Sequence, residues 1–85
     1  MTKTYRALYQ IAGEIRTCIG NGSWSVNASA YARPYMTAML QLDTIDDHYG
    51  QDSAKEIVLR FLCNAGTWRG ETARRVKAEL KEWVK

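Results

Sequence analysis

Residues 67–83, TWRGETARRVKAELKEW, connect an apolar segment to a basic helix with alternating charges. Thr67 is a residue type that caps helices, which would place the next three residues, Trp68 to Gly70, in the first helical turn. Glycine in a helical turn lowers helix stability, so Gly70 suggests that another backbone or a partner approaches too closely for a side chain. We expect Trp68 to pack beneath the preceding helix and Arg69 to point outward or toward acidic residues.

The remainder of this stretch has the pattern of an amphipathic helix. Its apolar stripe consists of Ala73, Val76, Leu80 and Val84, with Trp83 at the margin. Apolar residues at this spacing lie on one side of a helix and predict that this side is buried. Glu71 and Arg75 are four residues apart, as are Arg75 and Glu79, so these side chains can pair along the helix.

The same helix carries a second stripe whose charges are less compensated, formed by Arg74, Lys77, Lys81 and Lys85. Such a row of cations can follow the phosphates of a nucleic acid, with an affinity that depends on salt. A helix face of this kind is more often simply solvated. Both interpretations remain open from the sequence.

The segment before residue 67 predicts a short third helix. Ser53 and Glu56 have the spacing of a capping box, and residues 57–63, IVLRFLC, are apolar nearly all round. A helix without a polar side belongs in the centre of a domain. We expect its one charge, Arg60, to reach the surface or to pair with Asp43 or Asp47.

Two further helices precede this one. Apolar residues at helical spacing run from Pro34 to Gly50, and an earlier set runs as far as Gly20, with Thr2 or Thr4 available as its N-cap. Four helices with short connections predict an all-α fold: a compact four-helix domain covering residues 1–85, with the short apolar third helix at its centre.

Three carboxylates, those of Asp43, Asp46 and Asp47, fall at helical offsets near the end of the predicted second helix. Negative charge is unfavourable at a helix C-terminus, so the presence of three carboxylates there needs an explanation. It is a candidate docking site for a cation, either a metal ion or an arginine of a partner. Alternatively, an arginine of the same chain, such as Arg69, forms an ion pair with these aspartates, or the aspartates are solvated. We expect no tight metal binding, because His48 is the only nitrogen ligand nearby and is poorly placed.

The size and charge of the chain limit the class of protein. With 85 residues and 46% hydrophobic content, a single core is only just sufficient, so a homo-oligomer is possible. The net charge of +3 is unevenly distributed: residues 43–56 are mainly acidic, and residues 66–85 hold six cations against three glutamates. This distribution suits a partner of mixed charge or self-association.

The cysteines and the hydropathy pattern suggest a compartment. Cys18 and Cys63 lack the spacing of a zinc site and lie in apolar stretches, which predicts buried free thiols in a reducing environment. No apolar run approaches the about 18 residues that a membrane span needs. We therefore expect a cytoplasmic protein without a membrane partner.

Three segments resemble a known family: SAYARPYMTAMLQLD at residues 29–43, YGQDS at 49–53 and NAGTWRGETARRVKAEL at 64–80. They are similar to short proteins of unknown function found in bacterial phages and integrative elements. The resemblance covers roughly residues 28–82, and its most distinctive part contains WRGE. It implies a mobile-element origin and a compact helical domain, and it supplies no catalytic residue.

No motif combines a nucleophile, a base and an oxyanion donor, so we expect neither an enzyme nor a cofactor. The favoured function is a binding protein that inhibits or modulates a host protein, as an anti-defence or anti-CRISPR-like factor. The residues proposed to bind the partner are Trp68, Arg69, Asp43, Asp46 and Asp47. The alternative is a nucleic-acid-binding accessory protein that uses the cationic stripe of the last helix, Arg74, Lys77, Lys81 and Lys85.

Overall fold

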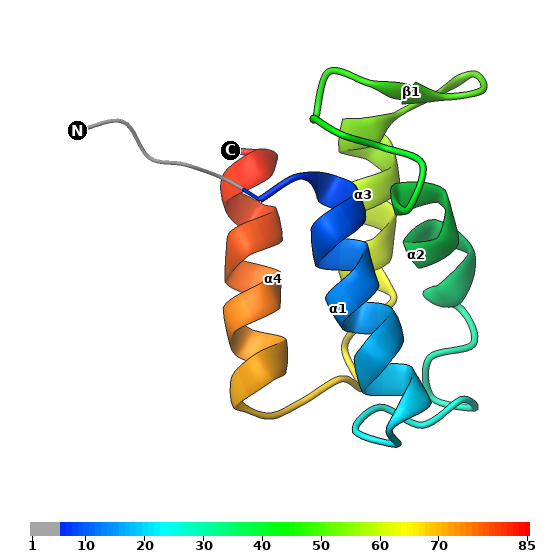
Figure 1. Ribbon diagram of the computed structural model, residues 1–85, viewed down its shortest axis with the longest axis vertical. Coiled ribbons are helices and arrows are strands. Elements are labelled where there is room, and N and C mark those ends of the chain that lie inside the picture. The colour runs from blue at the N-terminus through cyan, green and yellow to red at the C-terminus, as the bar shows by residue number, and fades with distance from the viewer. Residues whose placement is uncertain (1–5) are drawn as a thin grey trace.

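A computed structural model describes residues 6–85 and contains four helices and one short hairpin (Figure 1). The elements are α1 (Leu8–Gly20), α2 (Arg33–Met39), β1 (His48–Tyr49), β2 (Asp52–Ser53), α3 (Ala54–Cys63) and α4 (Glu71–Trp83). The strands pair antiparallel, with His48 opposite Ser53 and Tyr49 opposite Asp52. The four predicted helices are present, but the hairpin makes the fold mostly helical rather than purely all-α.

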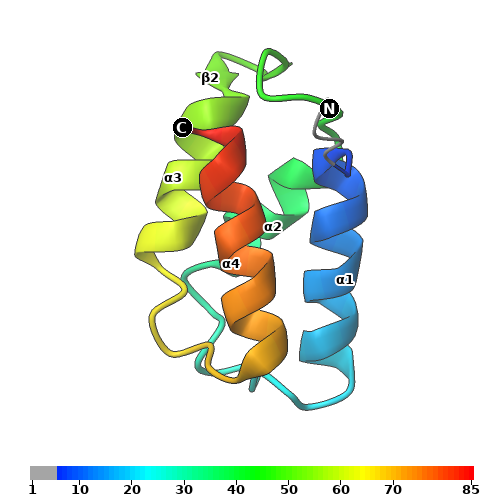
Figure 2. The ribbon, with the colours of Figure 1, turned by 90° about the vertical axis from the view of Figure 1, so that its left-hand side faces the viewer.

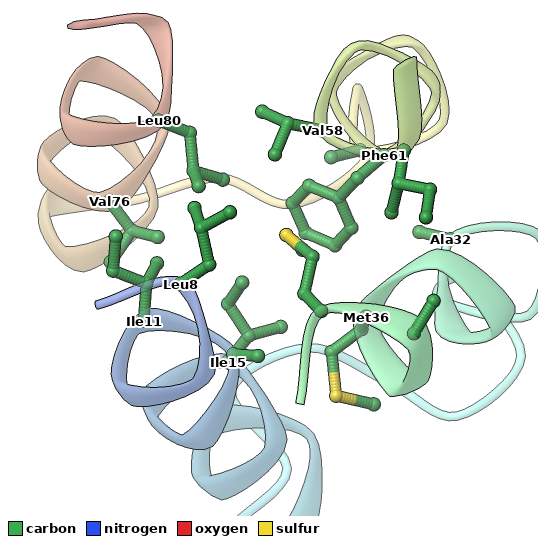
Figure 3. Close-up of a cluster of buried hydrophobic side chains, with 14 of the residues drawn as sticks. Leu8, Ile11, Ile15, Ala32, Met36, Val58, Phe61, Val76 and Leu80 are labelled. Carbon is green, nitrogen blue, oxygen red and sulfur yellow. The ribbon is translucent and has the colours of Figure 1, made fainter. Parts of the chain in front are cut away.

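The helices surround one hydrophobic core. α1 and α4 run in opposite directions (Figures 1 and 2), and α2 contacts both α1 and α3. Side chains from all four helices meet at the centre, among them Leu8, Ile11, Ile15, Met36, Val58, Phe61, Val76 and Leu80 (Figure 3). Each helix therefore buries one apolar side, and its other side faces solvent.

The N-terminal end of α1 is capped by a glutamine. The backbone N–H of Ala7 donates a hydrogen bond of 2.9 Å to the side-chain oxygen of Gln10, which satisfies a group that the helix leaves free. The proposed caps Thr2 and Thr4 lie outside the described residues. The predicted stop at Gly20 is confirmed, because α1 ends there.

The predicted second helix is too long. α2 ends at Met39 rather than Gly50, because the following residues form turns. The carboxylate of Asp47 accepts backbone N–H bonds from Asp43 at 2.8 Å and from Thr44 at 3.1 Å, and such local bonds compete with helix formation. Gly50 has a φ of 63° in the hairpin connection, so its left-handed backbone serves a turn and not a helix end.

The third helix is buried on one side only, so the structure does not place it at the centre of the domain as its apolar sequence predicts. Its N-terminus has the predicted cap, since Ser53 Oγ accepts the N–H of Glu56 at 3.2 Å. The side chain of Leu59 is 42% exposed. Arg60 pairs with Glu56 at 2.9 Å on the exposed side, and not with an aspartate of residues 43–47.

The last helix begins later than predicted. Gly70 is its N-cap with a φ of 109°, a conformation that side-chain-bearing residues rarely adopt. A Cβ on Gly70 would meet no atom within 4 Å, so the backbone angle explains the glycine and a close approach does not. Thr67 does not cap α4; its hydroxyl accepts the indole N–H of Trp24 at 3.1 Å and donates to the carbonyl of Ala28 at 3.1 Å.

Two tryptophans close one end of the core. The rings of Trp24 and Trp68 stack at 5.2 Å between centroids and 11° between planes, and Phe61 meets Trp24 edge-on at 6.1 Å. Both tryptophans are 2% exposed. The expectation that Trp68 packs in the core is confirmed, and its stacking partner comes from the connection between α1 and α2.

We predict that Trp68→Ala lowers the free energy of unfolding by about 3 kcal/mol or more, because it leaves a cavity beside Trp24. For a chain of this size that loss lowers the Tm by more than about ten degrees in a circular dichroism melt. Tyr31→Ala is the control, since Tyr31 is 80% exposed and its loss should cost less than about 0.5 kcal/mol. A Trp68→Ala melting curve that coincides with that of the wild type would refute the core position of the ring.

Candidate partner-binding site

The structure separates the residues that the sequence grouped into one site. Asp43, Asp46 and Asp47 lie in the turns after α2, at the end of the molecule where α1 begins, since the N–H of Leu8 donates to the carbonyl of Asp43 at 2.9 Å. Arg69 precedes α4, which begins at the opposite end in both views (Figures 1 and 2). The alternative in which Arg69 reaches toward these aspartates is therefore wrong.

The three aspartates do not share a helix face, because the residues that carry them are not helical. The carboxylate of Asp47 accepts hydrogen bonds from the backbone N–H groups of Asp43 and Thr44 and so stabilises the turn. These hydrogen bonds hold the pKa of Asp47 below its ordinary value. Asp43 and Asp46 are exposed. Across residues 6–85, no group of three His, Cys, Asp or Glu side chains is arranged to hold a metal ion.

Trp68 and Arg69 are adjacent in sequence but have different environments. The Trp68 ring is buried, so in the folded protein it has little surface to offer a partner. Arg69 is exposed at the start of α4. Of the pair, only Arg69 remains a candidate for direct contact.

The side of α4 that faces α1 carries balanced charges. Arg6 bonds both carboxylate oxygens of Glu79, at 2.8 and 2.7 Å, and also Glu14 at 2.8 Å. Arg75 bonds the other oxygen of Glu14. This four-residue network links the residues before α1 to α1 and α4, and it neutralises its own charges.

The network changes the pKa of Glu14. Partial burial raises that pKa, but the hydrogen bonds from Arg75 and Arg6 outweigh burial, so the pKa lies below its ordinary value. In the same network, the hydrogen bond to Glu79 raises the pKa of Arg6 above its ordinary value. The network therefore stabilises the fold with its carboxylates ionised.

The other side of α4 is basic. We call Arg69, Arg74, Lys77 and Lys81 the basic edge. The ammonium of Lys77 donates a hydrogen bond of 2.6 Å to the carbonyl of Trp68. Burial lowers the pKa of Lys77, and the nearby charges of Lys81 and Arg69 lower it further. Like charges are thus gathered here, and the field of this edge attracts anions.

The predicted cationic stripe is only partly available. Lys77 is half-buried and its ammonium is bound to the Trp68 carbonyl, so it is already engaged within the chain. Lys85 pairs with Glu82 at 2.9 Å. In contrast, Arg69, Arg74 and Lys81 are exposed and take part in no ion pair with any residue of 6–85.

The cysteines differ from each other. Cys18 is buried, and burial raises the pKa of its thiol, as does the charge of Glu14, which makes it a poor nucleophile. Cys63 is exposed at the end of α3, so the prediction that both thiols are buried is wrong for Cys63. Both are free, and no disulfide joins them.

Comparison with protein-family models, with curated proteins and with solved structures gave no match to this chain. The resemblance to proteins of phages and integrative elements therefore stays a prediction. None of the helices in residues 6–85 combines the length and the apolar character that crossing a membrane requires.

We predict that acid destabilises the protein partly through Glu14. A carboxylate with a lowered pKa in the folded state contributes stability above its unfolded value, ordinarily 4.5, and loses this contribution as pH falls through the folded value. Glu14→Gln should lower the free energy of unfolding by about 1 kcal/mol at pH 7, measured by urea denaturation, and should make the loss at acid pH smaller.

Glu56→Gln is the matched control for Glu14→Gln. Its partner Arg60 and Glu56 itself are about half exposed, at 49% and 52% of their side-chain surface, so the change should cost less than about 0.5 kcal/mol at pH 7. If the two substitutions changed the free energy of unfolding equally at every pH, Glu14 would not contribute to stability through its ion pairs as proposed.

Proposed function

We propose that this protein is a small non-enzymatic binding protein that modulates a host protein by contacting an acidic surface with the basic edge of α4. The observation that supports this is that the cations on one side of α4 are paired with carboxylates, whereas those on the other side are not, within the described part of the chain. Arg75 on one side is neutralised by Glu14, whereas Arg74 and Lys81 on the other form no ion pair with residues 6–85. Exposed uncompensated cations steer and orient an anionic partner.

The resemblance to mobile-element proteins supports an anti-defence role within this proposal, such as an anti-CRISPR-like inhibitor that occupies a surface of its target. In this proposal the protein works in the cytoplasm of the host cell and needs no cofactor. Self-association through the acidic turns and the basic edge is compatible with it, because residues 43–56 and 66–85 have opposite charge balances.

Binding of nucleic acid is the second candidate, supported by the exposure of Arg74 and Lys81 on one helix. Phosphate recognition gains from many cations along a row. Two of the four stripe residues, Lys77 and Lys85, already have partners within the chain. This reduction favours a protein partner over a nucleic acid.

We predict that reversing the charge of the basic edge abolishes partner capture without unfolding the protein. Immobilised wild-type protein and the variants Arg74→Glu and Lys81→Glu would be exposed to host lysate, with retained proteins identified by mass spectrometry. Arg16→Glu is the matched control, since Arg16 is exposed on α1 and its reversal changes the net charge equally. A host protein should be retained by the wild type and by Arg16→Glu, and lost from both basic-edge variants.

Retention that is equal for all four proteins, or absent for all, contradicts the proposal. Capture that disappears after nuclease treatment supports the nucleic-acid alternative instead. In that case a gel shift should weaken steeply as salt is raised.

A further inference from the structure

An apolar side chain of α3 lies outside the core. Leu59 is 42% exposed, although its neighbour Val58 is fully buried. Leu62, one turn further along, is partly buried and packs against the core. Isolated exposed leucines are ordinary, so the significance of Leu59 depends on what surrounds it.

Leu59 lies on the outward side of α3, next to the side that borders α4. Val58 points from α3 toward Leu80 of α4 (Figure 3), and the two helices are in contact. Residues three and four apart lie on one side of a helix. Leu62 is therefore on the same side as Val58, and Leu59 is further outward beside Lys55.

The basic edge of α4 borders the same region. Leu80 marks the core side of α4, and the adjacent residue Lys81 is exposed. Lys77, one turn earlier on the same side, reaches back to the carbonyl of Trp68 after the end of α3. We call the surface formed by Lys55, Leu59, Leu62 and the basic edge the α3–α4 face.

Three of the four glutamates of these two helices have ion-pair partners, and the fourth, Glu71, is exposed at the start of α4. Glu79 bonds Arg6 on the α1 side of α4, Glu82 pairs with Lys85, and Glu56 pairs with Arg60. The α3–α4 face thus combines two leucines with cations that these carboxylates do not neutralise. Its complement in charge and polarity is a segment with both carboxylates and apolar side chains.

We infer that the α3–α4 face binds an acidic segment of a partner protein that also carries apolar residues. This inference rests on the proposed function and adds the chemistry of the partner. Leu59 would be covered by an apolar side chain of the partner, while Arg69, Arg74 and Lys81 pair with its carboxylates along α4. A nucleic acid would satisfy the cations but would gain little from Leu59.

The core holds this surface in place before a partner arrives. The Lys77 ammonium is fixed on the Trp68 carbonyl, and the Trp68 ring is fixed by Trp24. Arg69 thus lies between two fixed points, because the next residue, Gly70, is the N-cap of α4. A surface that is already ordered loses less conformational entropy when it binds.

Fluorescence anisotropy with labelled probes tests the inference on the full chain at low salt. The first probe is a peptide of about 14 residues, about four helical turns, made of Glu and Leu. The second replaces every Leu with Ser, the third replaces every Glu with Gln, and the fourth is a DNA duplex. The variants are Lys81→Glu and Leu59→Ser, with Arg16→Glu on α1 and Val26→Ser in the α1–α2 connection as controls at exposed positions outside α3 and α4.

The Glu and Leu peptide should bind more tightly than the other three probes. Lys81→Glu should weaken it by about tenfold, and Leu59→Ser by about fivefold, as expected for burying part of a leucine. The two control variants should bind as the wild type does. Circular dichroism of each variant should match the wild type, since all four positions are exposed.

Three results would overturn the inference: no binding of the Glu and Leu peptide below about 1 mM, equal binding of the Glu and Ser peptide, or tightest binding of the duplex without dependence on Leu59. These results are distinct from a failure of the proposed function. If lysate capture still requires Arg74 and Lys81, the proposed function stands and only the partner chemistry is wrong. If the peptide binds as expected but no host protein is captured, the proposed function fails and the binding face remains.

Discussion

The stacking of Trp24 on Trp68 is the contact on which the arrangement of the helices depends. Trp24 follows α1 and Trp68 precedes α4, so the stack joins the α1–α2 connection to the α3–α4 connection at one end of the core. The indole N–H of Trp24 also bonds Thr67, whose hydroxyl bonds Ala28. Burying two large rings and satisfying the indole group stabilises connections that have no regular structure of their own.

The stack also connects the fold to the candidate site. The carbonyl of Trp68 accepts the Lys77 ammonium, and the next residue is Arg69, the first cation of the basic edge. The direction of α4, and hence the side on which Arg74 and Lys81 emerge, is set by the backbone that Trp68 fixes. The aromatic residue stabilises the fold, and its neighbour remains available for contact.

The apolar periodicity predicted where helices exist better than where they end. The apolar stripes of α1 and α4 and the Ser53 cap of α3 were sufficient to predict these three helices, because helix faces and caps are local properties. The predicted second helix was too long because Ile45 and Tyr49 continue the apolar spacing, whereas the Asp47 carboxylate binds the backbone N–H groups of Asp43 and Thr44. Periodicity does not register such competition for backbone groups. Of the two alternatives for Arg69, pairing with the aspartates was wrong and exposure was right. The contacts of Trp24 with Trp68 and of Lys77 with the Trp68 carbonyl had no signal in the spacing.

Hydrogen exchange at the indole N–H of Trp24 tests most directly whether the rest of the fold depends on this stack. This proton is buried and bonded to Thr67. If the stack opens only when the whole domain unfolds, its exchange should give the same free energy as urea denaturation and as the slowest amides of α1 and α4. Much faster exchange of the indole proton, while those amides remain protected, would show that the two connections open separately and would contradict the central place given to the stack.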